Sequence, residues 1–225
     1  MIKMKETINA CIENAERLIN DAIMLDFENT AATQFFLSVI SQEESSKAFL
    51  LYFVSIRIIP WNQYLLRVLK DHKCKHLIGI IIDYLEPDDK IFAERLDILI
   101  KQNKALEVPQ SIFDSLNILR YEKIGRWESK NWVWGDDYEY DRYAQKVADG
   151  YIDVRKQNSL YVNIDNMGKV QTKPSIITEE EAKRELDKAK RFLNFVRGIS
   201  CSAQDKPLHY DKIENAFKIL FTGRV

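Results

Sequence analysis

Glycine and proline are scarce in this sequence, which has 7 Gly and 5 Pro among 225 residues. So few chain-breaking residues argue against a β-sandwich, a β-barrel or a glycine-rich nucleotide-binding sheet, and they favour long helices. Neither sign of charge is in excess, since 33 Lys and Arg stand against 34 Asp and Glu. Bulk charge therefore does not draw the protein to nucleic acid or to an anionic membrane, and any such contact depends on a local patch.

Long hydrophobic runs are also missing. The longest, from Ala48 to Ile56, is well short of the ~20 residues that a membrane span requires. The N-terminus leads directly into an amphipathic pattern and lacks the apolar segment of a signal peptide. The three cysteines, Cys11, Cys74 and Cys201, have neither disulfide nor zinc-ligand spacing. These features predict a soluble, cytoplasmic protein in a reducing compartment, without a membrane partner.

Apolar residues recur at every third or fourth position along most of the chain, a spacing that predicts helices. The predicted helices cover about 5–24, 30–59, 61–86, 91–100, 111–120, 140–154, 179–198 and 209–221. Between Leu160 and Thr172 the apolar residues alternate around a Gly-containing turn, which predicts one short β-hairpin. The sequence therefore predicts a mainly α protein with a single hairpin.

Helical spacing breaks down between Trp127 and Tyr140, a segment that holds three of the four tryptophans beside acidic residues. We interpret this segment as a Trp-rich loop inserted into a helical scaffold. The tryptophans would suit a protein interface, or they would form a satellite core against the helices. The predicted single domain covers 1–225, with core helices at about 5–100 and 139–198 and an insertion at about 101–138.

Motifs of the common enzyme classes are absent from the sequence. It has no Walker loop, no G-x-G-x-x-G, no G-x-S-x-G, no H-E-x-x-H and no C-x-x-C pair. With only 3 His in the chain, a histidine-rich metal site is disfavoured. We therefore expect neither a metal nor a cofactor.

Glu43 is a local conflict in the second predicted helix, and such conflicts tend to mark functional positions. It falls on the same stripe as Val39 and other apolar or small residues. A carboxylate there requires a buried partner, for which the sequence offers Lys47, four residues further on, His72 or Arg155. A structural polar network and a functional carboxylate both remain open as interpretations.

His72 shares a stripe with Leu65 and Leu69 in the third predicted helix, so it also points inward. Taken alone, it is best interpreted as a hydrogen-bonded interior histidine on a helix with a basic outer face. Paired with Glu43 from the neighbouring helix, it would instead form a site, because bundles build sites from inward-facing polar groups on adjacent helices.

The polar stretch from Arg155 to Val162 lies where a predicted helix ends and the hairpin begins. Cations in a last helical turn commonly complement the helix dipole. The functional alternative is that this stretch presents a cation and the Tyr161 phenol to a phosphate.

These polar stretches share their order and spacing with a known family. They comprise Ala31 to Ser38 leading into Glu43-Glu44-Ser45-Ser46-Lys47, then Asp71 to Lys75, then Arg155 to Val162 followed by Asp165, Gly168 and Pro174. Together they resemble the AbiV abortive-infection family, a branch of the HEPN helical superfamily. The resemblance implies a HEPN-like antiparallel helical bundle that commonly forms a homodimer. It also implies a role in bacterial defence, in which the infected cell is halted before phage can multiply.

Many HEPN proteins are metal-independent ribonucleases, whose signature is an Arg, four to six residues, and a His at the dimer cleft. By this resemblance Arg155 occupies the Arg position, whereas Tyr161 stands where the His would fall. A tyrosine, with an ordinary pKa of about 10, is a poor general base near neutral pH. His72 could supply the imidazole if the fold brings it near Arg155.

On this hypothesis the protein is a phage-defence ribonuclease toxin. Arg155 would hold the scissile phosphate, His72 or Tyr161 would exchange protons, and Glu43 would orient them. Further candidates for contacts with the substrate are Lys47, Lys75, Lys156 and Asn158.

The alternative hypothesis is a non-catalytic helical binding module. Such a module would sense a phage-encoded protein or block a component of the host translation machinery. The expected partners are thus a second copy of the chain, a phage protein that acts as a trigger, and RNA or a ribosome-associated target.

Overall fold

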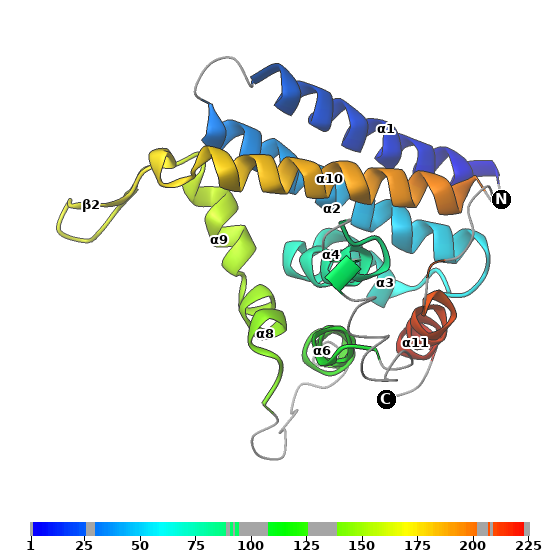
Figure 1. Cartoon of the computed structure of the whole chain (residues 1–225). Coiled ribbons are helices and arrows are strands. Elements are labelled where there is room, and N and C mark those ends of the chain that lie inside the picture. Colours follow the sequence, from blue (N-terminus) through cyan, green and yellow to red (C-terminus); the bar gives the residue numbers. More distant parts are fainter. Residues whose placement is uncertain are drawn as a thin grey trace.

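Three long helices form the framework of the protein, which is described here by a computed structural model. They are α1 (Ile2–Met24), α2 (Ala31–Ser55) and α10 (Glu179–Ser200). Both α1 and α10 pack against α2, which also contacts α4 (His72–Leu85) (Figure 1). The structure describes residues 2–25, 30–88, 91, 93–94, 108–125, 139–201, 207 and 209–222. Among these residues the predicted mainly α fold is confirmed.

The first helix buries the stripe that its sequence predicts. Ile8, Ile12, Ala15, Ile19 and Ala22 are all buried, and they face α2 in an antiparallel pair. Because α2 is enclosed by α1, α10 and α4, its small polar residues are buried as well as its apolar ones. Three of its buried serines donate to backbone carbonyls: Ser38 and Ser46 within α2, and Ser41 Oγ to the Ala15 carbonyl at 2.9 Å.

The prediction of one continuous helix at about 61–86 is wrong. The chain forms two helices instead, α3 (Gln63–Lys70) and α4, which meet at Asp71. The Asp71 backbone is extended, and its carboxylate accepts a hydrogen bond from the Cys74 N–H at 3.0 Å. Aspartate competes for backbone donors in this way and so starts a new helix. The break makes His72 the first residue of α4.

The predicted helix at 140–154 also divides into two, α8 (Arg142–Asp149) and α9 (Tyr151–Asn158). They are separated by Gly150, which has a φ of 100°, in the left-handed region that glycine enters without strain. Asp141 caps α8 by accepting from the N–H groups of Tyr143 and Ala144. The kink at Gly150 directs α9 toward α2 and α4.

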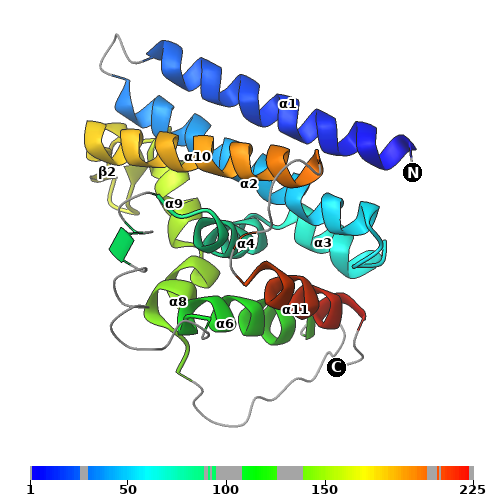
Figure 2. The same cartoon turned by 45° about the vertical axis from the view of Figure 1, so that its right-hand side comes forward.

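A second layer of shorter helices lies beneath α4 (Figure 2). It comprises α6 (Gln110–Asn117), the π-helical η2 (Ile118–Gly125), α8 and α11 (Tyr210–Thr222). Buried apolar residues of these elements belong to the same core cluster as α1, α2, α4 and α10. The described part of the predicted insertion is therefore integrated into the core, whereas Trp127, Trp132 and Trp134 lie outside the described residues.

The predicted hairpin is confirmed. Strands β1 (Asn163–Ile164) and β2 (Val170–Thr172) pair in antiparallel fashion and extend away from the helices (Figure 1). Its turn is organised by Asp165, whose carboxylate accepts from the N–H groups of Met167 and Lys169, both at 2.9 Å. A short 3-10 turn, η3 (Pro174–Ile176), then leads into α10.

Across the part of the chain that the structure describes, no helix combines the length and apolar character that crossing a membrane requires.

A side chain at Gly150, between α8 and α9, should lower the stability of the protein. A Cβ added there would lie 2.8 Å from Lys73 Cε, and the lysine would have to give up the hydrogen bond from its Nζ to the Asp149 carbonyl. A left-handed backbone costs a non-glycine residue about 1–2 kcal/mol by itself. We therefore expect Gly150→Ala to lower the free energy of unfolding by about 2 kcal/mol in urea titrations.

Gly168→Ala is the matched control. Gly168 also has a positive φ, of 80°, but no atom lies within 4 Å of its added Cβ. Its exposed turn is not packed against the core, so the measured loss should be smaller. A Gly168→Ala loss equal to or larger than that of Gly150→Ala would contradict the packing argument.

Candidate functional site

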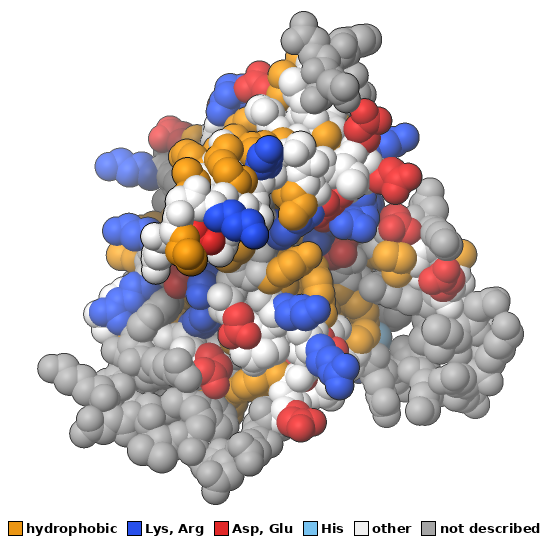
Figure 3. All heavy atoms as spheres, turned by 90° about the vertical axis from the view of Figure 1, so that its left-hand side faces the viewer, with side chains coloured by type: hydrophobic (Ala, Val, Ile, Leu, Met, Phe, Trp, Pro, Cys, Tyr) orange, Lys and Arg blue, Asp and Glu red, His pale blue; other side chains and the backbone are white. Residues whose placement is uncertain are grey.

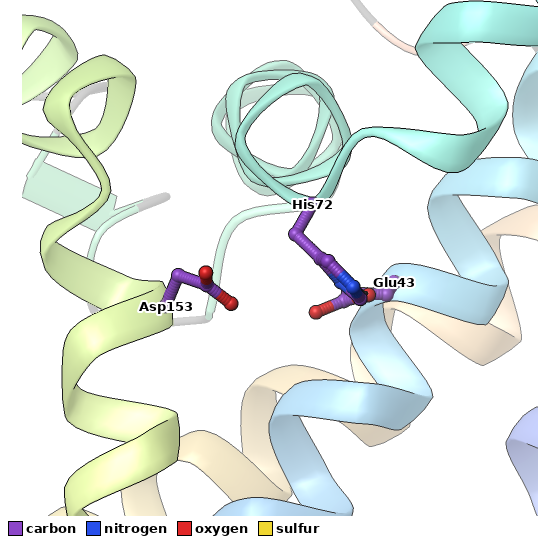
Figure 4. A group of neighbouring side chains, drawn as sticks. All are labelled: Glu43, His72 and Asp153. Carbon is purple, nitrogen blue, oxygen red and sulfur yellow. Dashed lines mark hydrogen bonds and ion pairs between the residues drawn. The ribbon is translucent and has the colours of Figure 1, made fainter.

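The Glu43 carboxylate is the centre of the candidate site. Glu43 is only 2% exposed, as the sequence pattern predicts. One oxygen, Oε1, accepts from Lys156 Nζ at 2.7 Å. The other, Oε2, lies 2.7 Å from Lys75 Nζ and 2.6 Å from His72 Nδ1. The expectation that His72 reaches Glu43 is confirmed, and Figure 4 shows the two side chains in contact.

Three helices deliver these groups to one point. Glu43 projects from the middle of α2, and His72 and Lys75 lie one turn apart at the start of α4. Residues at this spacing share a helix face, so the cap at Asp71 aims both side chains at α2. Lys156 comes from the last turn of α9, which contacts both α2 and α4.

The surroundings of Glu43 keep it ionised. Burial alone would raise the pKa of its carboxyl, but nearby cationic groups outweigh this effect and lower the pKa to about 2. His76 contributes only when protonated, and its own pKa is lowered to about 4, chiefly by burial. At neutral pH the two ammonium groups, of Lys75 and Lys156, are therefore what stabilises the carboxylate. Glu43 cannot act as an acid near pH 7.

His76 is a member of the site that sequence reasoning did not identify. It follows His72 by one turn and is 5% exposed. Its Nε2 lies 3.4 Å from Glu43 Oε1, within ion-pair distance but without hydrogen-bond geometry among the described residues. Its spacing from His72 could have identified it, because residues i and i+4 of a helix lie on the same face.

His72 is the member of the site that solvent reaches. Its side chain is 50% exposed, so the predicted interior position is wrong, because the stripe with Leu65 and Leu69 ends at the helix break. The lysines beside it are buried. An ionised carboxylate can only accept, so Nδ1 is the donor in the 2.6 Å contact. The neutral ring that makes this contact is the Nδ1–H tautomer. In that tautomer Nε2 carries the free lone pair. The arrangement is an imidazole oriented by a buried carboxylate, the dyad that general acid–base sites use.

Arg155, one of the three alternative partners expected for Glu43, does not join this group. Its guanidinium binds the Glu181 carboxylate through Nε, at 3.2 Å, and through Nη2. Glu181 lies in the first turn of α10, where its N–H donates to Thr178 Oγ1 at 3.1 Å. Thr178 thus caps α10, while the Glu181 side chain pairs with Arg155.

Lys47 and Asn158, two of the candidates for contacts with the substrate, pair with residues outside the Glu43 cluster. Lys47 Nζ pairs with Glu44, at 2.5 Å, and not with Glu43, because Glu44 shares the outward-facing side of α2 with it. Asn158 is buried and holds the hairpin, since its Oδ1 accepts from Asn163 Nδ2 and, at 3.4 Å, from Thr172 Oγ1. Neither of the two side chains contacts the Glu43 cluster among the described residues.

Tyr161 is the residue that was predicted, as the alternative to His72, to exchange protons. It is 63% exposed, just before strand β1. No interaction joins it to His72 or Glu43 in the described part of the chain. The predicted combination of Arg155, Tyr161 and His72 is therefore not assembled as one set of contacts. Lys75 and Lys156, proposed as substrate cations, are buried against Glu43 instead.

Comparisons with known proteins identify one family. A sequence model of the AbiV family, of the HEPN group, matches residues 3–194. The match extends from α1 into α10, and it includes every residue of the site described above. No curated protein and no solved structure matches the chain.

The buried imidazole of His76 should make stability depend on pH. Because burial lowers its pKa from 6.5 to about 4, the unfolded chain binds a proton that the folded protein excludes. The stability that neutral His76 contributes to the folded protein is fully present above pH 6.5 and is lost as pH falls toward 4. Between pH 7 and 5 this amounts to about 2 kcal/mol.

Urea denaturation of the wild type and of His76→Asn at pH 7 and pH 5 tests this expectation. The variant should lose most of the difference between the two pH values that the wild type shows. The low pKa of Glu43 does not interfere, because its contribution is lost only as pH falls below about 4.5. An unchanged difference in His76→Asn would show that another group is responsible.

Proposed function

Because the chain belongs to the AbiV family of HEPN proteins, we propose that it arrests phage-infected cells as a ribonuclease with His72 as its acid–base group. The observation that carries the proposal is the dyad of His72 and Glu43. Nδ1 is held by an ionised, buried carboxylate, and the His72 side chain is half-exposed. This geometry supports a group that takes up and returns a proton.

In the proposed reaction His72 Nε2 accepts the proton of a ribose 2′-hydroxyl. The 2′ oxygen then attacks the neighbouring phosphorus, and the bond from phosphorus to the 5′ oxygen breaks. The imidazolium returns its proton to the departing 5′ oxygen, directly or through water. Glu43 stays ionised throughout and stabilises the imidazolium, as the carboxylate of a catalytic triad does.

The phosphate requires a cation, and we assign this role to Arg155. Lys75 and Lys156 are engaged by Glu43 and are buried. The guanidinium of Arg155 is held by a carboxylate that is itself partly accessible, with 18% of each side chain exposed. An RNA phosphate matches the bidentate geometry of Arg as well as a carboxylate does, so it could replace Glu181.

A second candidate function is supported by a different surface. Exposed apolar side chains gather on α9 and the hairpin, where Figure 3 shows hydrophobic groups among lysines and arginines. A free two-stranded hairpin with open edges is marginally stable alone and readily pairs with another chain. We propose this surface as the contact for a second copy or a phage-encoded trigger. Its exposed apolar residues are Tyr151, Val154, Leu160, Tyr161, Val162, Ile164, Met167, Val170 and Ile176.

Removal of the imidazole should abolish function while the protein stays folded. We expect His72→Ala to lose phage protection and RNA cleavage in infected cells by at least ~100-fold, the scale of an acid–base group. The melting temperature should change little, because His72 is half-exposed and is not part of the core. Glu43→Gln keeps the shape of the side chain and loses its charge, so it should also remain folded and inactive.

Lys47→Ala is the control variant, since its surface pair with Glu44 should be dispensable. Plaque counts, gel analysis of total RNA and thermal melting are measured on all four proteins. A His72→Ala protein that protects and cleaves normally would exclude the catalytic proposal. If Glu43→Gln lost activity only together with its fold, Glu43 would be structural.

The hairpin surface should be required for self-association of the protein. Ile164 is 61% exposed on β1, and Ile164→Lys should weaken self-association without lowering the melting temperature. Sedimentation at micromolar concentration should shift from a dimer toward the 26.4 kDa of one chain. Ile219→Lys, at an equally exposed position on α11, is the control and should leave the mass unchanged. A wild-type protein that sediments as a monomer would contradict the homodimer.

A further inference from the structure

Three potential metal ligands converge in the candidate site. Glu43 from α2, His72 from α4 and Asp153 from α9 each offer one donor atom, and these atoms lie within 4.8 Å of one another. Figure 4 shows the Asp153 carboxylate facing His72 and Glu43 across the space between the helices. Two carboxylates and one imidazole form a donor set that suits Zn²⁺ when water completes the coordination.

The space among these donors contains the ammonium of Lys156. Its Nζ lies 2.7 Å from Glu43 Oε1 and 2.8 Å from Asp153 Oδ1. It also lies 3.2 Å from His72 Nδ1, so one ammonium is next to all three groups. Nδ1 would bind a metal only after giving up the proton that it donates to Glu43. Lys156 is 5% exposed, which makes it part of the interior and not a mobile surface side chain.

The charges around Lys156 balance. At neutral pH the two carboxylates contribute two negative charges, and the ammonium groups of Lys156 and Lys75 contribute two positive ones. Lys75 approaches Glu43 from its other oxygen, Oε2, at 2.7 Å. Removal of Lys156 would therefore leave Asp153 and Glu43 Oε1 without this cation, while Lys75 would still hold the far side of Glu43.

A buried nitrogen also points toward the same place. His76 Nε2 lies 3.4 Å from Glu43 Oε1, and it has no hydrogen-bond partner among the described residues. A neutral imidazole nitrogen beside a carboxylate oxygen is a typical neighbour of a bound cation, either as a further ligand or in support of one.

We propose that Lys156 is a tethered cation that occupies a latent metal site, and that its removal opens Glu43, His72 and Asp153 to Zn²⁺. Distances are consistent with the exchange. Zinc binds nitrogen and oxygen at about 2.0–2.2 Å, so each donor would move inward by about 0.5–1 Å from its present contact with the ammonium. In the native protein the lysine both neutralises the carboxylates and blocks the metal.

Zinc titration of metal-stripped Lys156→Ala, followed by calorimetry and thermal melting, tests the proposal without RNA and independently of the proposed activity. We expect one Zn²⁺ per chain and a rise in melting temperature that EDTA reverses. The wild type, Lys47→Ala and the double variant Lys156→Ala/Asp153→Asn should each bind roughly 100-fold more weakly, the upper range for loss of groups that organise a metal site. Co²⁺ in place of Zn²⁺ should give the visible absorption of a site with nitrogen and oxygen ligands.

Two results would overturn the proposal. One is that the wild type binds Zn²⁺ as tightly as Lys156→Ala, and the other is that binding to Lys156→Ala is absent or indifferent to Asp153→Asn. If Lys156→Ala is unfolded without metal, circular dichroism during Zn²⁺ addition replaces the melting curve. Lys156→Ser is tested beside it, because its hydroxyl can hold water in the vacated space. Folding of either variant on addition of Zn²⁺ supports the proposal, and failure of both to fold or bind refutes it.

Discussion

The structure depends on a carboxylate buried in the middle of its central helix. Glu43 is enclosed between α2, α4 and α9, where an ionised group costs several kcal/mol unless cations and hydrogen-bond donors surround it. The partners come from the first turn of α4 and the last turn of α9. Both helices must therefore dock on α2 at a fixed height and rotation. A network of this kind adds specificity more than stability, since apolar residues of similar volume would pack at least as favourably.

Stability comes from the opposite half of α2. Phe49 and Phe53 are fully buried there with ring centroids 4.7 Å apart. Phe49 also contacts Phe195 of α10 and Phe217 of α11, at 5.8 and 5.9 Å. These four rings join three helices into one apolar cluster. The polar site and the aromatic cluster thus occupy different lengths of the same helix.

The sequence predicts the scaffold and the central residue of the site, but it does not predict how charged groups pair. Glu43 and His72 were recognisable because each shares a predicted stripe with apolar residues. The pattern predicts the burial of Glu43 correctly, whereas His72 is half-exposed because its stripe ends at Asp71. Arg155 had several acidic residues within reach in principle, and only the docking of α9 beside α10 selects Glu181. Lys47 likewise pairs with Glu44 and not Glu43. Lys47 could pair with an acidic residue three or four residues earlier. Which one it reaches depends on which side of α2 is covered by neighbouring helices.

The helix breaks at Asp71 and Gly150 were missed for a related reason. Helical periodicity continues through both positions, so spacing alone indicates one helix in each case. Asp71 ends one helix and caps the next with its carboxylate, and Gly150 adopts a backbone that other residues avoid. Both breaks serve the site, since the first places His72 at a helix start and the second turns Lys156 toward Glu43. Local chemistry at single residues, rather than periodicity, therefore decides where the functional groups point.

Nearly all charged groups of the site are already paired, which limits the charge contacts that a bound polyanion would gain. Lys75 and Lys156 are held by Glu43, and Arg155 is held by Glu181. A phosphate arriving there would gain a guanidinium only by releasing a carboxylate, so the net change in charge contacts is small. Such an exchange adds little to affinity, whereas contact with free surface cations would add the counterion release that drives most nucleic-acid binding. The chain as a whole has a net charge of -1, so long-range attraction does not compensate. Under the proposed function, selectivity would then come from shape and from the hairpin surface, and electrostatics would act when Arg155 exchanges Glu181 for a phosphate.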